Sequence, residues 1–133
     1  MEKMMSSNES LQSKIISTSK FAVLHPKATL KEALDKMTHH RLGIACLVDE
    51  SEVITGVLTD GDLRRLLLTK QAPLPALLVS PAIEFGHANP TTLKLSATID
   101  EARKLMLEKE IWDIPVVDNN NKLVGLIHRH SIS

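Results

Sequence analysis

The sequence predicts an α/β fold in which two copies of one small β-α-β-β-α unit pack sheet to sheet. An internal repeat is the first observation behind this prediction, and the same order of strand and helix patterns in each copy is the second. The third is composition: 43% of the 133 residues are apolar but only 2% are aromatic. The chain can therefore bury a core, and that core must be aliphatic.

The repeat is visible in two ten-residue segments. Residues 28–37 read ATLKEALDKM, and residues 97–106 read ATIDEARKLM. Continued without a gap, the same offset aligns Gly56 with Gly125, and it keeps apolar residues aligned with apolar residues in between. We attribute this register to a tandem duplication.

Each copy has a predicted helix with its own start signal. Thr29 and Thr98 each precede an amphipathic stretch, and Glu32 and Glu101 follow three residues later, which is the pattern of a capping box. A further helix is predicted over residues 62–69. The predicted strands are 21–24, 44–48 and 53–58 in the first copy, and 91–95, 114–117 and 123–127 in the second.

These elements divide the chain into four parts. Residues 1–17 are expected to form a flexible leader, and residues 18–70 the first unit. Residues 71–90, which are rich in proline, are expected to link it to a second unit over residues 91–133. The second unit stops where the first would begin its last helix, so that helix is expected to be missing.

Composition excludes several classes of protein. Lys and Arg balance Asp and Glu at 16 each, so the chain is poorly suited to bind the phosphate backbone of DNA or RNA, and we expect neither as a partner. A single cysteine, Cys46, excludes an internal disulfide framework. No apolar stretch is long enough to span a membrane and no signal peptide is evident, so we expect a cytoplasmic protein without a membrane partner.

The strongest local pattern is GVLTDGDLRR at residues 56–65. A buried strand ends there and a helix begins around Asp60, so that backbone N–H groups and the Thr59 hydroxyl can receive an anion. Asp62 can accept both hydroxyls of a ribose, and Arg64 and Arg65 can offer a counter-charge to phosphate. The same residues also fit a plain helix cap beside a solvated basic face, and both interpretations stay open.

Two such units, with the G-h-x-T-x-x-D ending of the first and the ALDKM and IPVVD blocks, resemble a tandem CBS-domain pair, or Bateman module. The resemblance covers roughly residues 18–133. It implies two small sheets packed about a pseudo-twofold axis with helices outside, a regulatory role, and a homodimer.

The resemblance also implies a ligand site in the first unit. Thr59 would bind phosphate and Asp62 the ribose of an adenine or related nucleotide, while apolar residues of the second strand line the base pocket. Residues of the loop before the first helix would close that pocket. The candidate ligand-binding residues are Thr59, Asp60, Asp62, Ile44, Ala45, Thr29 and Arg64.

The second unit departs from this pattern. His128 stands where the first unit has Thr59, and Ser131 stands where it has Asp62. Serine cannot replace a carboxylate on a ribose diol, so the basic residues there either contact a phosphate or an acidic sugar or are surface residues. The weaker second site comprises Ile114, Pro115, His128 and Arg129. Because the sequence places no third ligand near the two histidines at 128 and 130, no metal site is expected.

The longer string TDGDLRR, residues 59–65, resembles the regulatory CBS region of sugar-phosphate isomerases of the arabinose 5-phosphate isomerase type. A similar string occurs in CBS pairs of sugar nucleotidyltransferases. The resemblance implies a sensor that binds a nucleotide or sugar nucleotide, such as an adenine nucleotide or a CMP-sugar, and controls an attached or partner sugar-phosphate isomerase. It implies no catalytic residues and no resident cofactor, and the alternative parent is a sugar nucleotidyltransferase. A module that only oligomerises and binds nothing is the alternative.

Overall fold

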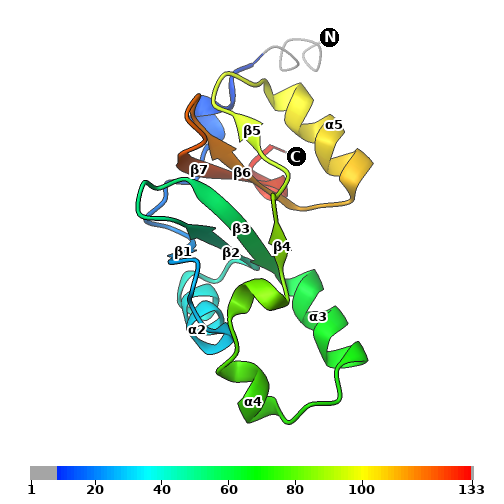
Figure 1. The fold of residues 1–133 in the computed structure, drawn as a ribbon. Coiled ribbons are helices and arrows are strands. Elements are labelled where there is room, and N and C mark those ends of the chain that lie inside the picture. Colours follow the sequence, from blue (N-terminus) through cyan, green and yellow to red (C-terminus); the bar gives the residue numbers. More distant parts are fainter. Residues whose placement is uncertain (1–8, 133) are drawn as a thin grey trace. The chain divides into compact units, whose positions relative to one another are not determined.

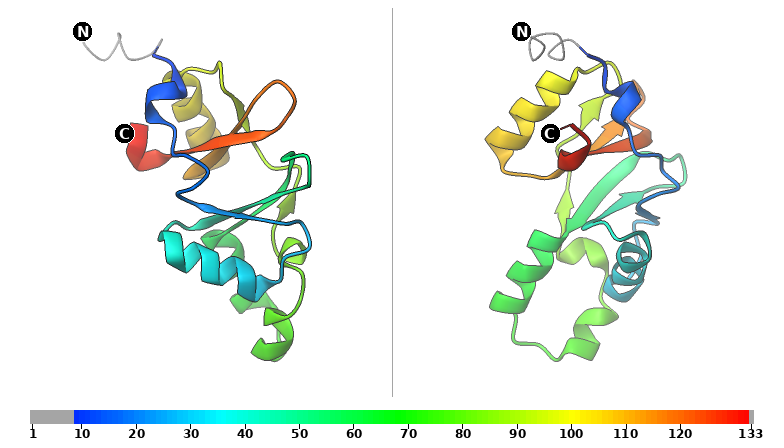
Figure 2. Two further views of the ribbon diagram at one scale, coloured as in Figure 1. Left: turned by 90° about the vertical axis from the view of Figure 1, so that its left-hand side faces the viewer. Right: turned by 180° about the vertical axis from the view of Figure 1, so that it is seen from behind.

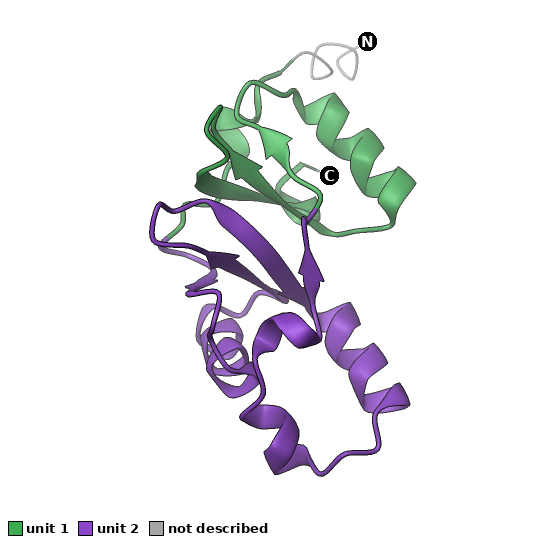
Figure 3. Cartoon of the chain, in the orientation of Figure 1, with its two compact units in different colours: residues 1–18, 91–133 green, residues 19–90 purple. Residues whose placement is uncertain are grey.

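A computed structural model describes residues 9–132, which form two compact units (Figure 3). We call residues 19–90 the first-repeat unit, purple in Figure 3. The second-repeat unit, green in the same figure, combines residues 91–132 with residues 9–18. Each unit contains one sheet and its own helices, so the predicted two-copy α/β fold is confirmed (Figure 1).

The first-repeat unit is built on a four-stranded sheet. Its strands are β1 (Ala22–Leu24), β2 (Ile44–Val48), β3 (Ile54–Thr59) and β4 (His87–Ala88), in the order β1-β2-β3-β4. β1 runs parallel to β2, and the other pairings are antiparallel. The sequence predicted the first three strands, whereas β4 lies in the segment that it assigned to the linker.

The helices of this unit cover one face of its sheet. They are α2 (Leu30–His40), α3 (Asp60–Thr69), α4 (Leu74–Leu78) and the 3₁₀ turn η2 (Ala82–Glu84). Figure 2 shows α2 in cyan lying along the strands. Buried aliphatic residues from α2, α3 and α4 join Ala45 of β2 and Leu58 of β3 in one core, which contains no aromatic residue among its fully buried members. The aliphatic core expected from composition is therefore present.

The second-repeat unit repeats this plan. Its elements are η1 (Leu11–Lys14), β5 (Leu93–Lys94), α5 (Ile99–Lys109), β6 (Asp113–Val117), β7 (Leu123–His128) and α6 (Arg129–Ile132). The sheet order is β5-β6-β7, again with a parallel first pair and an antiparallel second pair. The last helix of this unit was expected to be missing, but α6 forms the first turn of that helix.

The described part of the predicted leader belongs to the second-repeat unit, and this corrects the expectation of a flexible segment. Leu11 is fully buried in that unit's core, and its N–H donates to the carbonyl of Ala97. Ile16 exchanges two backbone hydrogen bonds with Leu126 of β7, of 2.8 and 3.0 Å. Residues 1–8 of the predicted leader lie outside the described residues.

The predicted linker has the corresponding place in the first-repeat unit. Ala82 N–H donates to the carbonyl of Ala28, the residue aligned with Ala97 by the repeat. The segment that follows then pairs with β3 as β4. The predicted leader and linker are therefore parts of the two compact units, because each segment is hydrogen-bonded to a strand of the unit that it joins. Within residues 9–132 no helix is both long and apolar enough to cross a membrane.

Candidate functional site

The junction between β3 and α3 brings the main candidate residues together. Thr59 is the last residue of β3, and Asp60 is the first of α3. The antiparallel register of β2 and β3 places Ile44 opposite Thr59. The N–H of Asp60 donates to the carbonyl of Gly43 at 3.0 Å, which fixes the point where the chain leaves the sheet.

Thr59 and Asp62 form the capping box that the sequence predicted. The Oδ2 atom of Asp62 accepts hydrogen bonds from the Thr59 N–H at 2.8 Å and from the Thr59 hydroxyl at 3.0 Å. The Asp62 N–H donates to Thr59 Oγ1 at 3.3 Å. The structural interpretation of these two residues is therefore confirmed, and the carboxylate is held at a fixed position in the first turn of α3.

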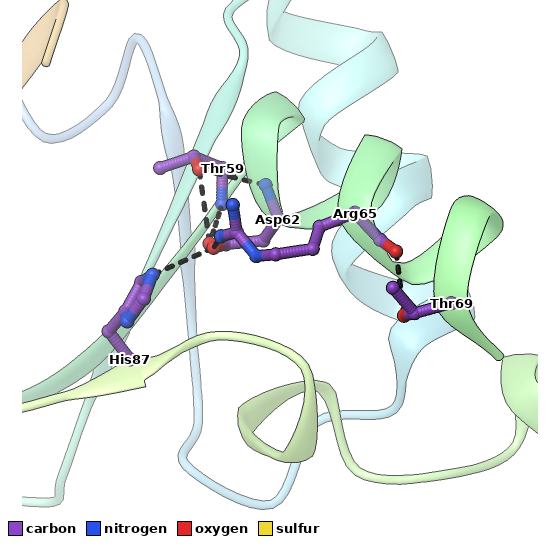
Figure 4. A network of polar contacts seen from close by, with 5 residues as sticks. All are labelled: Thr59, Asp62, Arg65, Thr69 and His87. Carbon is purple, nitrogen blue, oxygen red and sulfur yellow. Dashed lines mark hydrogen bonds and ion pairs between the residues drawn. The ribbon is translucent and has the colours of Figure 1, made fainter. Parts of the chain in front are cut away.

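The other carboxylate oxygen of Asp62 contacts the Arg65 guanidinium and the His87 imidazole, as Figure 4 shows. Arg65 Nη2 donates to Oδ1 at 2.6 Å, and His87 Nε2 lies 2.7 Å from the same oxygen. The Asp62 side chain is only 1% exposed, whereas those of Arg65 and His87 are 61% and 60% exposed. These two side chains therefore screen a buried carboxylate from solvent.

Sequence reasoning missed His87. It lies in the segment that the proline pattern assigned to a linker, and it reaches Asp62 only because β4 pairs with β3, with His87 opposite Val57. The spacing of residues 62 and 87 in the sequence does not indicate this contact. The contact depends on the pairing of β4, a strand of only two residues, with β3.

Asp60 and Arg64 lie two residues before and two residues after Asp62 in α3. Asp60 packs over Gly43, where an added Cβ would overlap its carboxylate. It also lines a hollow of about 270 Å³ beside α2, together with Arg41. Arg64 is exposed and folds back along α3, so that its Nη2 lies 3.9 Å from the position of a Cβ added at Gly61.

The remaining first-unit candidates are committed to packing and capping. Ile44 and Ala45 are 1% and 0% exposed, and Ala45 belongs to the helix-facing core. Thr29 caps α2: its hydroxyl accepts from the Glu32 N–H, and its own N–H donates to the Glu32 carboxylate. That backbone hydrogen bond from Thr29 lowers the pKa of Glu32 below its ordinary value. The structure thus brings Ile44 to Thr59, while it holds Ala45 and Thr29 in structural roles.

The second-repeat unit has a different set of side chains at the matching junction. His128 Nδ1 lies 2.7 Å from the carboxylate of Asp113, and the two residues face each other across β6 and β7. Arg129 stacks on Trp112, and the His130 ring meets the same indole edge-on at 5.7 Å. The result is a cluster of basic and aromatic groups in place of the acidic pair of the first repeat.

The other second-site candidates are buried in β6. Ile114 is fully buried and Pro115 is buried beside it. Arg129 also lines a hollow of about 210 Å³ together with Arg103. Among residues 9–132, no three His, Cys, Asp or Glu side chains are grouped so that they would hold a metal ion.

Comparison with known families identifies these units. The CBS domain family matches residues 13–69 and 83–133 of the chain, one match for each repeat. The chain belongs to the CBS domain family. The tandem CBS pair that the sequence resembled is thereby confirmed.

Curated relatives connect this CBS pair to longer proteins. An uncharacterized protein of Helicobacter pylori is 34% identical over 119 residues, which are 89% of this chain and 35% of the relative. Arabinose 5-phosphate isomerase GutQ of Salmonella typhi is 35% identical over 100 residues, 75% of this chain and 30% of the isomerase. The chain thus spans about a third of the length of the curated relatives that it matches.

Solved structures of CBS pairs share the fold. One is CBSX2 in complex with AMP, with a TM-score of 0.80 at 21% identity and 93% coverage of both chains. A CBS domain-containing protein from Bacillus anthracis gives a TM-score of 0.83 at 16% identity, covering 98% of this chain and 94% of its own. The CBS pair of protein MJ0100, in complex with 5′-methylthioadenosine and S-adenosyl-L-methionine, gives 0.73 at 21% identity and covers 88% of each chain.

Proposed function

We propose that this CBS pair is a regulatory module that binds an adenosine-containing nucleotide at the start of α3. The observation that carries the proposal is the Asp62 carboxylate, buried to 1% exposure and fixed by Thr59 at the end of a core strand. A buried carboxylate in a fixed position is a suitable acceptor for the two hydroxyls of a ribose. Related folds in complex with AMP, or with 5′-methylthioadenosine and S-adenosyl-L-methionine, support this ligand class.

The neighbouring groups supply the rest of the proposed contacts. The positive end of the α3 helix dipole, next to Thr59, favours an anion near the start of the helix. Arg64, exposed on the same turn, adds a positive charge. Ile44 lies opposite Thr59 in the sheet, and its apolar side chain would contact the base of the nucleotide.

We propose a different ligand chemistry for the second repeat. Ser131 stands in place of Asp62, and the Asp113 carboxylate is paired with His128, so neither position offers a free carboxylate to a ribose diol. Arg129, which is exposed, is the group suited to a phosphate or an acidic sugar. Ile114 and Pro115 would lie beneath such a ligand as part of the buried strand.

Isothermal titration calorimetry of the chain with AMP, ATP and a CMP-sugar tests the nucleotide proposal. We expect at least one adenine nucleotide to bind the wild-type chain and the Asp62→Asn variant to bind it at least about tenfold more weakly, because a charge-assisted acceptor is lost. Thr98→Ala is the matched control, since it removes a helix cap of the same kind from α5. Equal binding by wild type and Asp62→Asn would exclude Asp62 as the ribose acceptor.

We further propose that ligand occupancy controls a sugar-phosphate isomerase. The similarity to GutQ over 75% of this chain supports this choice of partner enzyme over a nucleotidyltransferase. The test is a chimera in which residues 13–133 replace the matching segment of GutQ. Ligand should change kcat/KM for arabinose 5-phosphate in this chimera, and the Asp62→Asn chimera should not respond. A chimera that is active but indifferent to ligand would refute the regulatory proposal.

We propose that the pair forms a homodimer, because it exposes large apolar side chains on two neighbouring helices. They are Leu67 and Leu68 of α3, at 69% and 79% exposure, with Leu74 of α4 at 56% and Val79 just after it at 73%. Sedimentation equilibrium should give twice the chain mass for the wild type and the chain mass for Leu67→Glu/Leu68→Glu. Dimerisation without any ligand heat would favour the module that only oligomerises.

A further inference from the structure

We propose that Arg65 and His87 make the Asp62 site selective for phosphorylated nucleosides over the same nucleosides without phosphate. This inference rests on the proposed binding of ribose at Asp62. Its basis is an exchange of partners: a ribose can bind Asp62 only by releasing the Arg65 guanidinium and the His87 imidazole, and a ligand phosphate then pairs with them.

The Asp62 carboxylate has no spare acceptor capacity. Each of its oxygens already has two partners, Thr59 N–H and hydroxyl on Oδ2, and Arg65 and His87 on Oδ1. A carboxylate offers about four lone-pair sites, so all of them are in use. Two donors must therefore leave before the two hydroxyls of a ribose can be accepted.

The two that leave at least cost are Arg65 and His87. The Thr59 N–H belongs to the backbone at the end of β3, and its hydroxyl also caps α3, so releasing them would uncap the helix. The side chains of Arg65 and His87 are 61% and 60% exposed and hydrate readily. Because the ribose hydroxyls replace them as donors to the buried Asp62 carboxylate, releasing these two side chains leaves no buried acceptor unpaired.

Once released, both groups stay beside the site. Arg65 is anchored in α3, where its carbonyl accepts the Thr69 hydroxyl at 2.8 Å, as Figure 4 shows. His87 is anchored in β4 through its pairing with Val57. Arg64, one residue before Arg65, adds a further positive charge, and Asp60 is the nearby acidic group, turned toward Gly43.

The released groups then distinguish one ligand from another. A phosphate can accept two hydrogen bonds from the Arg65 guanidinium and one from His87, which replaces the pairs lost with Asp62. A nucleoside without phosphate breaks the same pairs and leaves both groups to water. The site therefore favours the phosphorylated ligand even if ribose and base contacts are identical.

Competitive calorimetry with AMP and adenosine tests this selectivity. We expect wild type to bind AMP at least about tenfold more tightly than adenosine, because the phosphate of AMP makes at least one charge-assisted hydrogen bond that adenosine cannot make. In Arg65→Ala/His87→Ala the ratio should fall to about twofold, while adenosine binding stays equal or becomes tighter because Asp62 is no longer occupied. Lys36→Ala/His39→Ala is the matched control: it removes the same two residue classes from exposed positions of α2 and should keep the wild-type ratio.

The outcomes separate this inference from the proposed function. If neither compound binds wild type, the proposed function fails and the inference falls with it. If both bind and the double variant keeps the wild-type ratio, the function stands and the selectivity by Arg65 and His87 is refuted. Should the alanine variant not fold, Arg65→Gln/His87→Gln keeps neutral donors at both positions and must show the same collapse of the ratio.

Discussion

The guanidinium of Arg129 lies over the ring of Trp112, with its Cζ 4.8 Å from the ring centroid. At the matching positions of the first repeat, the Asp60 carboxylate packs over Gly43. The backbone is the same in both cases, because the N–H of the later residue donates to the carbonyl of the earlier one, at 2.8 Å and 3.0 Å. The two repeats therefore share this backbone hydrogen bond. They differ in both side chains at the junction, which are Gly43 and Asp60 in the first repeat and Trp112 and Arg129 in the second.

The Arg129–Trp112 contact should contribute measurable stability. A cation–π pair at an exposed site contributes about 0.5–1 kcal/mol, and Trp112 is 52% exposed. A double-mutant cycle of Trp112→Ala and Arg129→Ala, measured by urea unfolding, should give a coupling energy in that range. Strictly additive effects would show that the stacked geometry contributes nothing.

The Thr59 hydroxyl that caps α3 should contribute to the stability of the fold. Thr59→Ala removes the hydroxyl that accepts from the Asp62 N–H, and the free energy of unfolding should fall by about 0.5–2 kcal/mol. Thr59→Ser keeps a hydroxyl of the same kind and should stay within about 0.5 kcal/mol of wild type. Equal losses in the two variants would mean that the Thr59 methyl group, and not the cap, carries the effect.

Contacts close in sequence were predictable, and this covers most of the fold. The capping boxes of Thr29 with Glu32 and of Thr59 with Asp62 are local, so the identities of two residues three apart are enough to predict them. The placements of segments 9–16 and 80–88 were not predictable in this way. They are held largely by backbone hydrogen bonds, which require no particular side chain and leave little pattern in the sequence.

Site contacts that depend on strand pairing were likewise not predicted. His87 reaches Asp62 through a two-residue strand, so no sequence signal marks it. Asp113 differs, because the offset of 69 residues between segments 28–37 and 97–106 aligns it with Ile44 and aligns His128 with Thr59, although the pair was not predicted. Two simultaneous replacements at positions that face each other in the sheet indicate a pair, and the structure shows the carboxylate and imidazole 2.7 Å apart.

Leu11 tests the correction to the predicted leader. It is 0% exposed in the core of the second-repeat unit, so Leu11→Ala should lower the free energy of unfolding by about 2–5 kcal/mol. The neighbouring Gln12 is exposed, and Gln12→Ala should change stability by less than about 0.5 kcal/mol. If the two variants were equally stable in thermal and urea unfolding, this segment would be a leader after all.

The Glu32 cap predicts a pH dependence with a definite sign. Because the Thr29 backbone hydrogen bond lowers its pKa from 4.5, the folded state prefers the ionised carboxylate. The contribution of Glu32 to stability is therefore complete above pH 4.5 and is lost as the pH falls through the lower folded pKa. NMR titration of the side-chain carboxyl should show a midpoint below 4.5, and Glu32→Gln should lack this part of the pH dependence. A midpoint at or above that value would contradict the capping box.

Gly125 tests how tightly the N-terminal segment packs on β7. A Cβ added there would overlap Ile15 and lie 3.0 Å from the carbonyl oxygen of Ile16, so the segment must shift to admit it. We expect Gly125→Ala to cost about 1–3 kcal/mol and to speed amide hydrogen exchange at Ile16 and Leu126, whose mutual hydrogen bonds would be strained. Gly61→Ala is the control, because its Cβ would meet Thr59 Oγ1 at 3.6 Å, an ordinary contact, and should be neutral or stabilising by up to about 1 kcal/mol. Unchanged exchange at Ile16 in Gly125→Ala would show that the segment is not held against the strand in solution.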